Sequence, residues 1–290
     1  MPRKCLKGRL LAMKKSIVLT ALVLAALIVL VGCSSTPKIG DLINDALQGK
    51  GDEISDIFDG IGGDLLGGGK DDNGGGDSDF GKDTSLQGVF FDYQDTKGDL
   101  ILSINRTLIN ASDSGIGVST SLVSIFEIDA NMWPAYALWE DDLSVSATGR
   151  FMGNSDIEIV RSKNHAVITY LDENQNKVTF TADYDEAKGH YKLGYVSANG
   201  DRPTMELIRT SYGMAGQSFT GGLGMLENLY LISIQGDKGM IGVIHDTTQP
   251  APLTGQEAFD FPKMAAAEWY QYENGQVIGV GRDGQAIDTK

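Results

Sequence analysis

The chain has 290 residues, and 41% of them are hydrophobic, which is enough for a sizeable buried core. Its 24 Lys and Arg residues stand against 39 Asp and Glu residues, so the formal net charge is −15 at pH 7. Neutralising phosphates requires a basic surface, so this balance argues against a nucleic-acid partner. The two cysteines, Cys5 and Cys33, allow one disulfide at most.

The N-terminus has the pattern of an export signal. Residues 1–32 hold six basic residues and no acidic residue, and residues 17–31 are apolar apart from Thr20. A membrane-spanning helix needs about 20 apolar residues, so this run is short for a span and suits the apolar core of a signal peptide. The run ends at Gly32-Cys33, which predicts a cleavage site in front of the cysteine.

Residues 13–35 resemble the signal peptide of bacterial lipoproteins, whose lipobox ends in Gly or Ala followed by Cys. The resemblance implies cleavage between Gly32 and Cys33, and a diacylglyceryl cysteine with fatty-acyl chains such as palmitate at Cys33. The alternative is an uncleaved signal anchor with Cys33 as an ordinary thiol. Translation starts at Met1 or at Met13, since both positions precede a basic stretch.

The same resemblance implies a location in the cell envelope. Ser34, rather than Asp, follows the cysteine, which implies the outer membrane in a Gram-negative host and the outer face of the cell membrane in a host with one membrane. After cleavage the chain keeps 18 basic and 39 acidic residues, a net charge of −21, and no second cysteine for a disulfide.

Residues 33–84 predict an acidic, glycine-rich tether. Two segments in it, 39–47 and 54–65, carry apolar residues at helical spacing, but each is shorter than the roughly 12–15 residues that an isolated helix needs. They form either a weakly helical spacer or apolar stripes that dock on the globular domain or on a partner. Residues 67–88 predict a flexible linker, and their Asp residues lack the spacing of a calcium loop.

Residues 85–290 predict an antiparallel β domain. Residues 177–184 alternate polar and apolar side chains, which is typical of a strand with one buried face. This strand belongs to a predicted five-strand meander made of residues 157–160, 165–171, 177–184, 190–196 and 204–209. The Asn199-Gly200 pair between the last two strands favours a tight hairpin turn.

The rest of the domain is also predicted to be mainly strands. The further candidates are residues 99–105, 115–128, 143–148, 228–234, 240–245, 268–272 and 276–280, with helical turns near 130–139 and 263–267 and a long glycine-rich loop over 213–224. So many strands without alternating helices predict an all-β barrel or sandwich. Residues 86–90 resemble the opening of lipocalin-type barrels, with Phe90 in place of the usual Trp, and this resemblance implies the barrel.

The sequence carries no catalytic motif. The three histidines, His165, His190 and His245, lie in or beside predicted strands, where sequence neighbours point to opposite faces. The stretch 216–221 misses the Gly-x-Ser-x-Gly pattern by one position. We therefore expect no catalytic residue, no metal and no cofactor.

Aromatic residues are the best sequence candidates for ligand binding. Flat rings with a polar group suit a sugar or small-molecule site, although filling the core is their commoner role. The candidates fall in two clusters and are Trp133, Tyr136, Trp139, Trp269 and Tyr270.

Together these features predict a membrane-anchored envelope lipoprotein. Its β domain is expected to bind a small molecule, a glycan or an envelope protein without catalysis. The alternatives are an envelope hydrolase that uses acidic residues, and a structural or assembly lipoprotein whose apolar stripes in the tether make the contact.

Overall fold

The computed structural model describes residues 85–111, 120–222 and 227–290. The predicted signal peptide (1–32) and tether (33–84), and with them Gly32 and Cys33, lie outside the described residues. Within the described part of the chain, no helix is both long enough and apolar enough to cross a bilayer.

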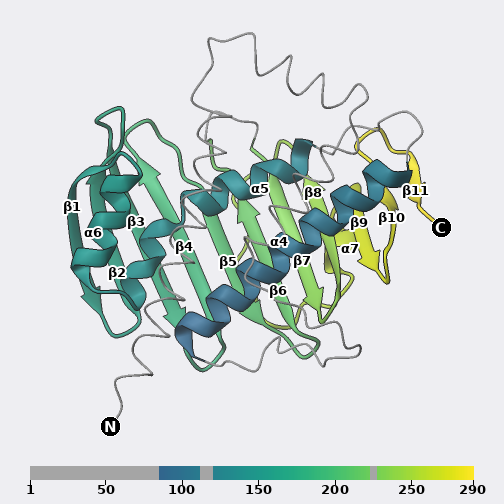
Figure 1. The fold of residues 1–290 in the computed structure, drawn as a ribbon, viewed down its shortest axis with the longest axis horizontal. Helices are drawn as coiled ribbons and strands as arrows, with labels where there is room; N and C mark the ends of the chain where they lie inside the picture. Colours follow the sequence, from purple (N-terminus) through teal and green to yellow (C-terminus); the bar gives the residue numbers. More distant parts are fainter. Residues whose placement is uncertain (1–84, 112–119, 223–226) are drawn as a thin grey trace. The chain divides into compact units, whose positions relative to one another are not determined.

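The described residues form a mostly β fold built on one antiparallel sheet (Figure 1). Its eleven strands pair in chain order, each with the next, as a continuous meander. The strands are β1 (Ser155–Ser162), β2 (His165–Leu171), β3 (Lys177–Asp185), β4 (His190–Ser197), β5 (Thr204–Arg209), β6 (Met214–Phe219), β7 (Leu229–Gln235), β8 (Lys238–Ile244), β9 (Glu268–Glu273), β10 (Gln276–Val280) and β11 (Ala286–Asp288).

The predicted five-strand meander is confirmed as β1 to β5. In β3 the side chains of Val178, Phe180, Ala182 and Tyr184 are buried, and those between them are half-buried or exposed. Side chains of a strand alternate between the two faces of a sheet, so the period-two pattern fixed which face turns inward. The predicted strands 228–234, 240–245, 268–272 and 276–280 are likewise found, as β7 to β10.

The sheet is open, so the expectation of a closed barrel is wrong. β1 and β11 are its two edges, and neither has a second neighbour among the described strands. These residues also contain no second sheet, which a sandwich requires. The apolar face of this sheet is covered by helices, so it does not need to close on itself or to meet another sheet.

Three segments predicted as strands are helices. Residues 99–105 lie in α4 (Leu86–Ala111), the described part of 115–128 lies in α5 (Thr120–Ala130), and residues 143–148 lie in α6 (Asp142–Phe151). Residues 86–90, which were expected to open a lipocalin-type strand, form the first turn of α4.

The spacing of the buried residues in α4 explains why this segment is a helix and not a strand. Its buried side chains recur at spacings of three and four residues through Val89, Tyr93, Lys97, Leu100, Ile104 and Leu108, which is one face of a helix. A stretch of seven residues such as 99–105 is too short to distinguish this period from that of a strand. The expected helical turns are found as the 3-10 helix η1 (Trp133–Leu138) and as α7 (Phe261–Ala265).

Strand β6 occupies much of the expected glycine-rich loop. All six of its residues are buried, and it pairs with β5 and β7. Gly216 lies in its middle, where a Cβ atom would overlap the hydroxyl of Tyr93 on α4. The glycine therefore allows the helix to approach the sheet closely, and it does not mark a loop at this position.

The two faces of the sheet are covered unequally. Helices α4, α5 and α6 cross one face, which we call the helix face (Figure 1). On the opposite face, β5 to β8 pack against residues 246–260, which we call the strap, and against α7; the contacts include Leu253 with Ile208 and Phe261 with Leu229. Over β1 to β4 the described residues leave this second face uncovered, and Val160 and Val196 are 69% and 60% exposed there.

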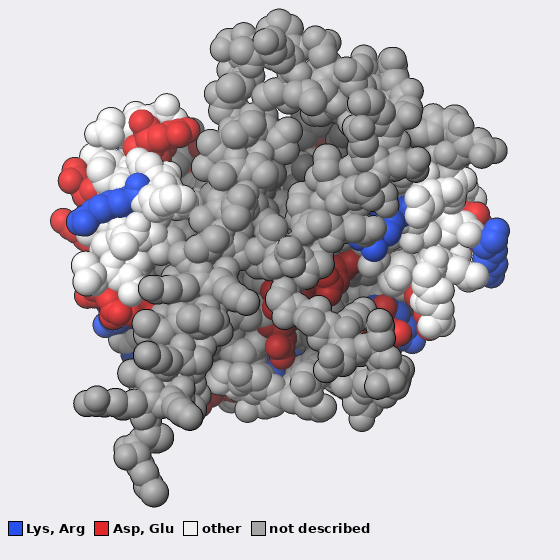
Figure 2. Space-filling view, viewed as in Figure 1, with Lys and Arg blue, Asp and Glu red and all other residues white. Residues whose placement is uncertain are grey.

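Figure 2 shows the helix face in space-filling form. Acidic and basic side chains both appear at the β1 and α6 end and at the β9 to β11 end, and among the described residues no continuous basic patch stands out in this view.

A buried ion pair joins α4 to α5 on the helix face. The Nζ of Lys97 lies 2.5 Å from the Oδ1 of Asp129, and the two side chains are 1% and 17% exposed. Burial lowers the pKa of Lys97 and raises the pKa of Asp129, while each charge opposes the shift of the other. The lysine also lies 4.9 Å from the centre of the Tyr93 ring, so its charge has two stabilising contacts.

We expect the Asp129→Ala variant to lose about 3–5 kcal/mol of unfolding free energy, because it leaves the Lys97 charge buried without its partner. The measurement is urea denaturation of the full chain, followed by circular dichroism. The Lys97→Met, Asp129→Leu double variant should recover most of the loss. Asp142→Ala, which removes an exposed partner of Arg161, serves as the control and should cost no more than about 1 kcal/mol. A loss at Asp129→Ala no larger than in this control would contradict the prediction.

Candidate functional site

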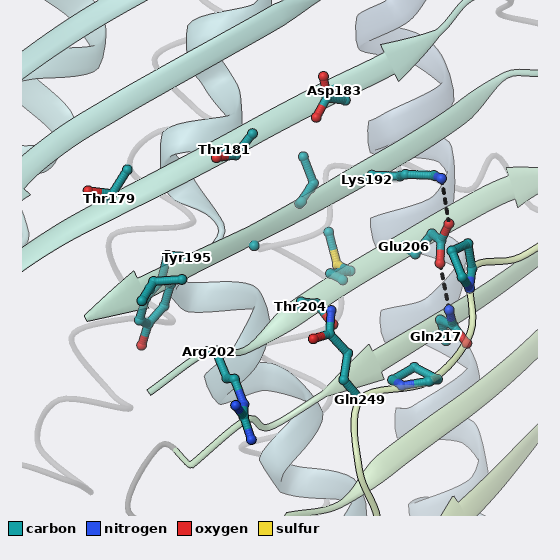
Figure 3. A pocket seen from close by; sticks show the side chains of 16 residues that line it. Thr179, Thr181, Asp183, Lys192, Tyr195, Arg202, Thr204, Glu206, Gln217 and Gln249 are labelled. Atoms are coloured by element: carbon teal, nitrogen blue, oxygen red, sulfur yellow. Dashed lines mark hydrogen bonds and ion pairs between the residues drawn. The ribbon is translucent and has the colours of Figure 1, made fainter. Parts of the chain in front are cut away.

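A groove lined by apolar and polar side chains lies on the face of the sheet opposite the helices, at the boundary between the part that the strap covers and the part left uncovered. It has a volume of about 370 Å³ and lies between the strap and strands β3, β4 and β5 (Figure 3). Its polar side chains include Thr179, Thr181, Asp183, Lys192, Arg202, Thr204, Gln217 and Gln249.

The floor of the groove is formed by a glycine between two threonines. Gly194 of β4 is opposite Thr181 of β3 on one side and opposite Thr204 of β5 on the other. A Cβ atom at Gly194 would lie 3.0 Å from the Cγ2 of Thr204 and 3.1 Å from the carbonyl oxygen of Pro203. Because Gly194 has no side chain, it leaves open space above the sheet at this position. The threonine hydroxyls beside it can donate and accept hydrogen bonds.

The buried carboxylate of Glu206 fixes the wall on the strap side. Its Oε1 lies 2.6 Å from the Nε2 of His190, and its Oε2 accepts hydrogen bonds from the Gln217 amide at 2.5 Å and from the Leu253 backbone N–H at 3.1 Å. Gln217 also donates to the carbonyl oxygen of Ala251 at 2.9 Å. The strap is thus tied to β5 and β6 by a largely buried hydrogen-bond network.

One cation lies at each end of the groove. Lys192 is opposite Glu206 in the ladder, and its Nζ is 3.9 Å from the Oε1 of that residue. Arg202 precedes β5 at the other end, and its Nη2 is 3.7 Å from the Oε1 of Glu227. Thr204 and Gln249 lie between the two cations, and Thr179 and Thr181 lie to one side of them on β3 (Figure 3).

No family model, curated protein or solved structure matches this chain. Its chemistry therefore has to be derived from the side chains themselves.

Each histidine pairs with a carboxylate from another strand. His165 lies 2.7 Å from Asp183, His190 lies 2.6 Å from Glu206, and His245 lies 2.6 Å from Glu268. The carboxylates adjacent to these histidines in the sequence are not their partners. The pairing of His165 with Asp183 follows from the register of β2 and β3, which places the two residues opposite each other.

His165 and Asp183 form an exposed hydrogen-bonded pair. Ser162 is opposite His165 in the ladder, which gives a row of Ser, His and Asp, but no hydrogen bond joins Ser162 to His165 among the described residues. The His165 and Asp183 side chains are 44% and 52% exposed, whereas the aspartate of a catalytic triad is buried. In the described residues, no group of three or more His, Cys, Asp or Glu side chains is placed to hold a metal ion.

The aromatic candidates lie away from the groove. Tyr136 and Trp139 pack against Phe90 at the start of α4, with the rings of Trp139 and Phe90 5.2 Å apart. Trp133 is buried, and its ring lies 5.4 Å from that of Tyr170.

The second aromatic cluster is divided by the sheet. Trp269 and Tyr270 are neighbours in β9, so their side chains point to opposite faces. Trp269 lies 4.6 Å from the Nζ of Lys263, and the Tyr270 hydroxyl donates to Glu268 at 2.9 Å. The structure therefore does not bring the two clusters together, and none of the five aromatic candidates lines the groove.

The groove residues carry no recognisable pattern in the sequence. Thr179, Thr181 and Lys192 read as ordinary exposed positions of alternating strands. The one available signal was Gly194, a glycine inside a strand pattern, which often marks a close approach by a ligand or by another backbone.

Removal of the Glu206 carboxylate should release the strap. In the Glu206→Ala variant the Leu253 N–H loses its acceptor and the buried His190 loses its partner, so we expect faster amide exchange over residues 249–253 and a loss of about 3–5 kcal/mol in unfolding free energy. Hydrogen–deuterium exchange with mass spectrometry measures the first effect, and urea denaturation measures the second.

Two further variants control this experiment. Glu206→Gln keeps an acceptor oxygen and should show a smaller effect, and Glu158→Ala removes an exposed carboxylate of β1 and should leave the strap unchanged. Strap exchange in Glu206→Ala equal to that of the unmodified chain would show that the carboxylate does not hold the strap.

Proposed function

We propose that this protein is a lipid-anchored protein of the cell envelope whose β domain binds a polar ligand in the groove, without catalysis. The observation that carries the proposal is the groove itself. It combines hydroxyl, amide, carboxylate and cationic side chains above a glycine floor, and its volume of about 370 Å³ falls in the usual range of small-molecule sites, roughly 300–1,000 Å³.

The rigidity of the groove supports binding. Its floor belongs to three adjacent strands, so Thr181, Gly194 and Thr204 are held in register by backbone hydrogen bonds. Its wall is held by Glu206 and Gln217, which are 8% and 5% exposed. Side chains that are already ordered lose little conformational entropy when a ligand arrives, and this favours affinity.

The contacts within the groove support binding rather than turnover. Two carboxylates line the groove, and each already has a partner: Asp183 pairs with His165 at 2.7 Å, and Glu206 pairs with buried His190 and is also occupied by Gln217 and Leu253. A general base needs a lone pair directed at the substrate, whereas the Glu206 carboxylate is directed at the strap.

The N-terminal sequence supports the anchor. A basic stretch, an apolar run of signal-peptide length and Gly32-Cys33 are the features that lipidation requires. Acyl chains on Cys33 would hold the protein at the membrane, since each buried CH₂ group contributes about 0.8 kcal/mol. The tether of residues 33–84 would then let the acidic domain stay clear of anionic lipid headgroups.

We expect a fatty-acid analogue supplied to growing cells to label the unmodified chain at Cys33. The Cys33→Ser variant should take up no label and should keep the uncleaved mass, because lipidation precedes cleavage in this pathway. The Cys5→Ser variant is the matched control, since it removes the other cysteine, and it should be labelled fully. Label that survives in Cys33→Ser would refute the anchor, as would an unlabelled native chain.

Groove binding can be tested with hydrogen–deuterium exchange of the full chain in detergent. The probes are maltotriose, trigalacturonic acid and the tripeptide Ala-Ala-Ala, and we expect at least one to protect residues 192–206 and 249–253. The Gly194→Val variant fills the floor and should weaken that binding at least about tenfold. Thr181→Val removes one hydroxyl and should weaken it by about 2–10-fold.

Thr169→Val on β2 is the control, because Thr169 lies on the same face outside the groove, and it should bind as the unmodified chain does. Absence of protection by all three probes would argue against the proposed site. Breakdown of a probe during incubation, detected by mass spectrometry, would favour the alternative of an envelope hydrolase.

A further inference from the structure

The two cations of the groove indicate the class of ligand. We infer that the ligand is an anionic oligosaccharide, which carries hydroxyl groups along its length and carboxylate or phosphate groups at intervals. This inference rests on the proposed function, because it concerns the same groove.

Lys192 has donor capacity that the protein does not use. Its side chain is 51% exposed, and its Nζ is 3.9 Å from the nearest Glu206 oxygen, beyond hydrogen-bond distance. That carboxylate already binds His190, Gln217 and the Leu253 N–H. Asp183, which is opposite Lys192 in the ladder, bonds to His165. The ammonium group can therefore donate toward the groove.

Arg202 is available in the same way at the other end. Its backbone N–H donates to the carbonyl oxygen of Gly221 at 2.6 Å, which fixes the position of its Cα atom. Its guanidinium is 58% exposed and lies 3.7 Å from the Glu227 carboxylate, and no hydrogen bond joins the guanidinium to the described residues. A guanidinium with its donors unused is suited to a carboxylate or phosphate.

The separation of the two cations favours an extended ligand. Arg202 comes four residues before Glu206, the ladder partner of Lys192, so the two positions are separated along the strand direction by about 13 Å at roughly 3.3 Å per residue. A single small anion cannot reach both ends of this span. An oligosaccharide with an anionic group on each sugar can place one group at each cation.

The uncharged polar side chains of the groove suit sugar hydroxyls. Thr179, Thr181, Thr204 and Gln249 each offer both a donor and an acceptor, which matches the mixed donor and acceptor character of a hydroxyl group. A peptide is the weaker match. Peptides commonly bind a sheet by extending its edge, whereas this groove lies on the face, where the backbone groups of β3, β4 and β5 are already paired with one another.

The net charge of the whole protein makes the binding of an anionic ligand depend on the two cations of the groove. The chain carries −15 overall, so its long-range field repels anions, and attraction must come from the two cations within about one Debye length, roughly 8 Å at physiological salt. The affinity of an anionic ligand should therefore depend on these two side chains individually and should fall as salt is added.

Isothermal titration calorimetry of the full chain in detergent tests the inference. We expect trigalacturonic acid to bind at least about tenfold more tightly than maltotriose, the neutral oligosaccharide of the same length. Lys192→Gln and Arg202→Gln should each weaken the trigalacturonate affinity by about 5–10-fold. Lys177→Gln is the matched control, because it removes one positive charge from an exposed position of β3 outside the groove, and it should change the affinity less than twofold.

Two smaller anions test whether the ligand is an oligosaccharide, a single acidic sugar or free phosphate. Galacturonic acid and inorganic phosphate can each reach one cation only, so both should bind at least about tenfold more weakly than the trisaccharide. Inorganic phosphate that binds as tightly as trigalacturonate would point to a free phosphate ligand and would overturn the inference.

The remaining outcomes distinguish this inference from the proposed function. If maltotriose or the tripeptide protects the groove from exchange as well as trigalacturonate does, and Lys192→Gln and Arg202→Gln change nothing, the ligand class is wrong and the binding site stands. If trigalacturonate binds without protecting residues 192–206 and 249–253, the groove is not its site. In that case the proposed function fails as well.

Discussion

The unequal cover on the two faces of one sheet is the constraint on which the rest of this structure depends. An open sheet must bury its apolar side chains against other elements, because it cannot fold over on itself as a barrel does. Here the helix face is covered from end to end by α4, α5, η1 and α6, whereas the strap and α7 cover the opposite face over β5 to β8. Under the strap, the second face carries apolar side chains such as Ile208 together with the buried polar Glu206 and Gln217, and beyond the strap it carries exposed valines, threonines and charged residues.

The groove lies along one edge of the strap, so the position of the strap on the sheet determines where the groove forms. Glu206 is a buried carboxylate, and the cost of removing its charge from water is offset by His190, Gln217 and the Leu253 N–H. These contacts hold the strap in a fixed place on the sheet. The same carboxylate lies 3.9 Å from the Lys192 ammonium group without forming a hydrogen bond to it. Glu206 therefore holds the wall, while the Lys192 ammonium group can still donate to a ligand in the groove.

The extent to which the fold could be predicted depended on the length over which each pattern runs. The meander β1 to β5 could be predicted, because buried and less buried side chains alternate clearly in β2 and β3 and because turn residues separate all five strands. Helix α4 could not be recognised from residues 99–105, since its period is visible only over the whole run from Val89 to Leu108. Strand β6 was not predicted, because Gly216 suggests a loop. In the structure this glycine leaves room for the Tyr93 side chain of α4. The groove was harder to predict than the fold. Exposed threonines and a lysine give a strand the same sequence pattern whether or not another segment lies beside them.

The sequence by itself determined the acidic charge and the alternating strands of the meander, because these are local features that neighbouring residues express together. It also carries the pattern at Gly32-Cys33 from which export is predicted. Only the tertiary structure decided that the sheet stays open and that a groove forms on it. The contacts responsible join residues far apart in the chain: 47 positions separate Leu253 from Glu206, and 34 separate Ala251 from Gln217. No pattern within one segment specifies such a pair, because each partner is an ordinary residue until the packing of helices and strap brings the two together.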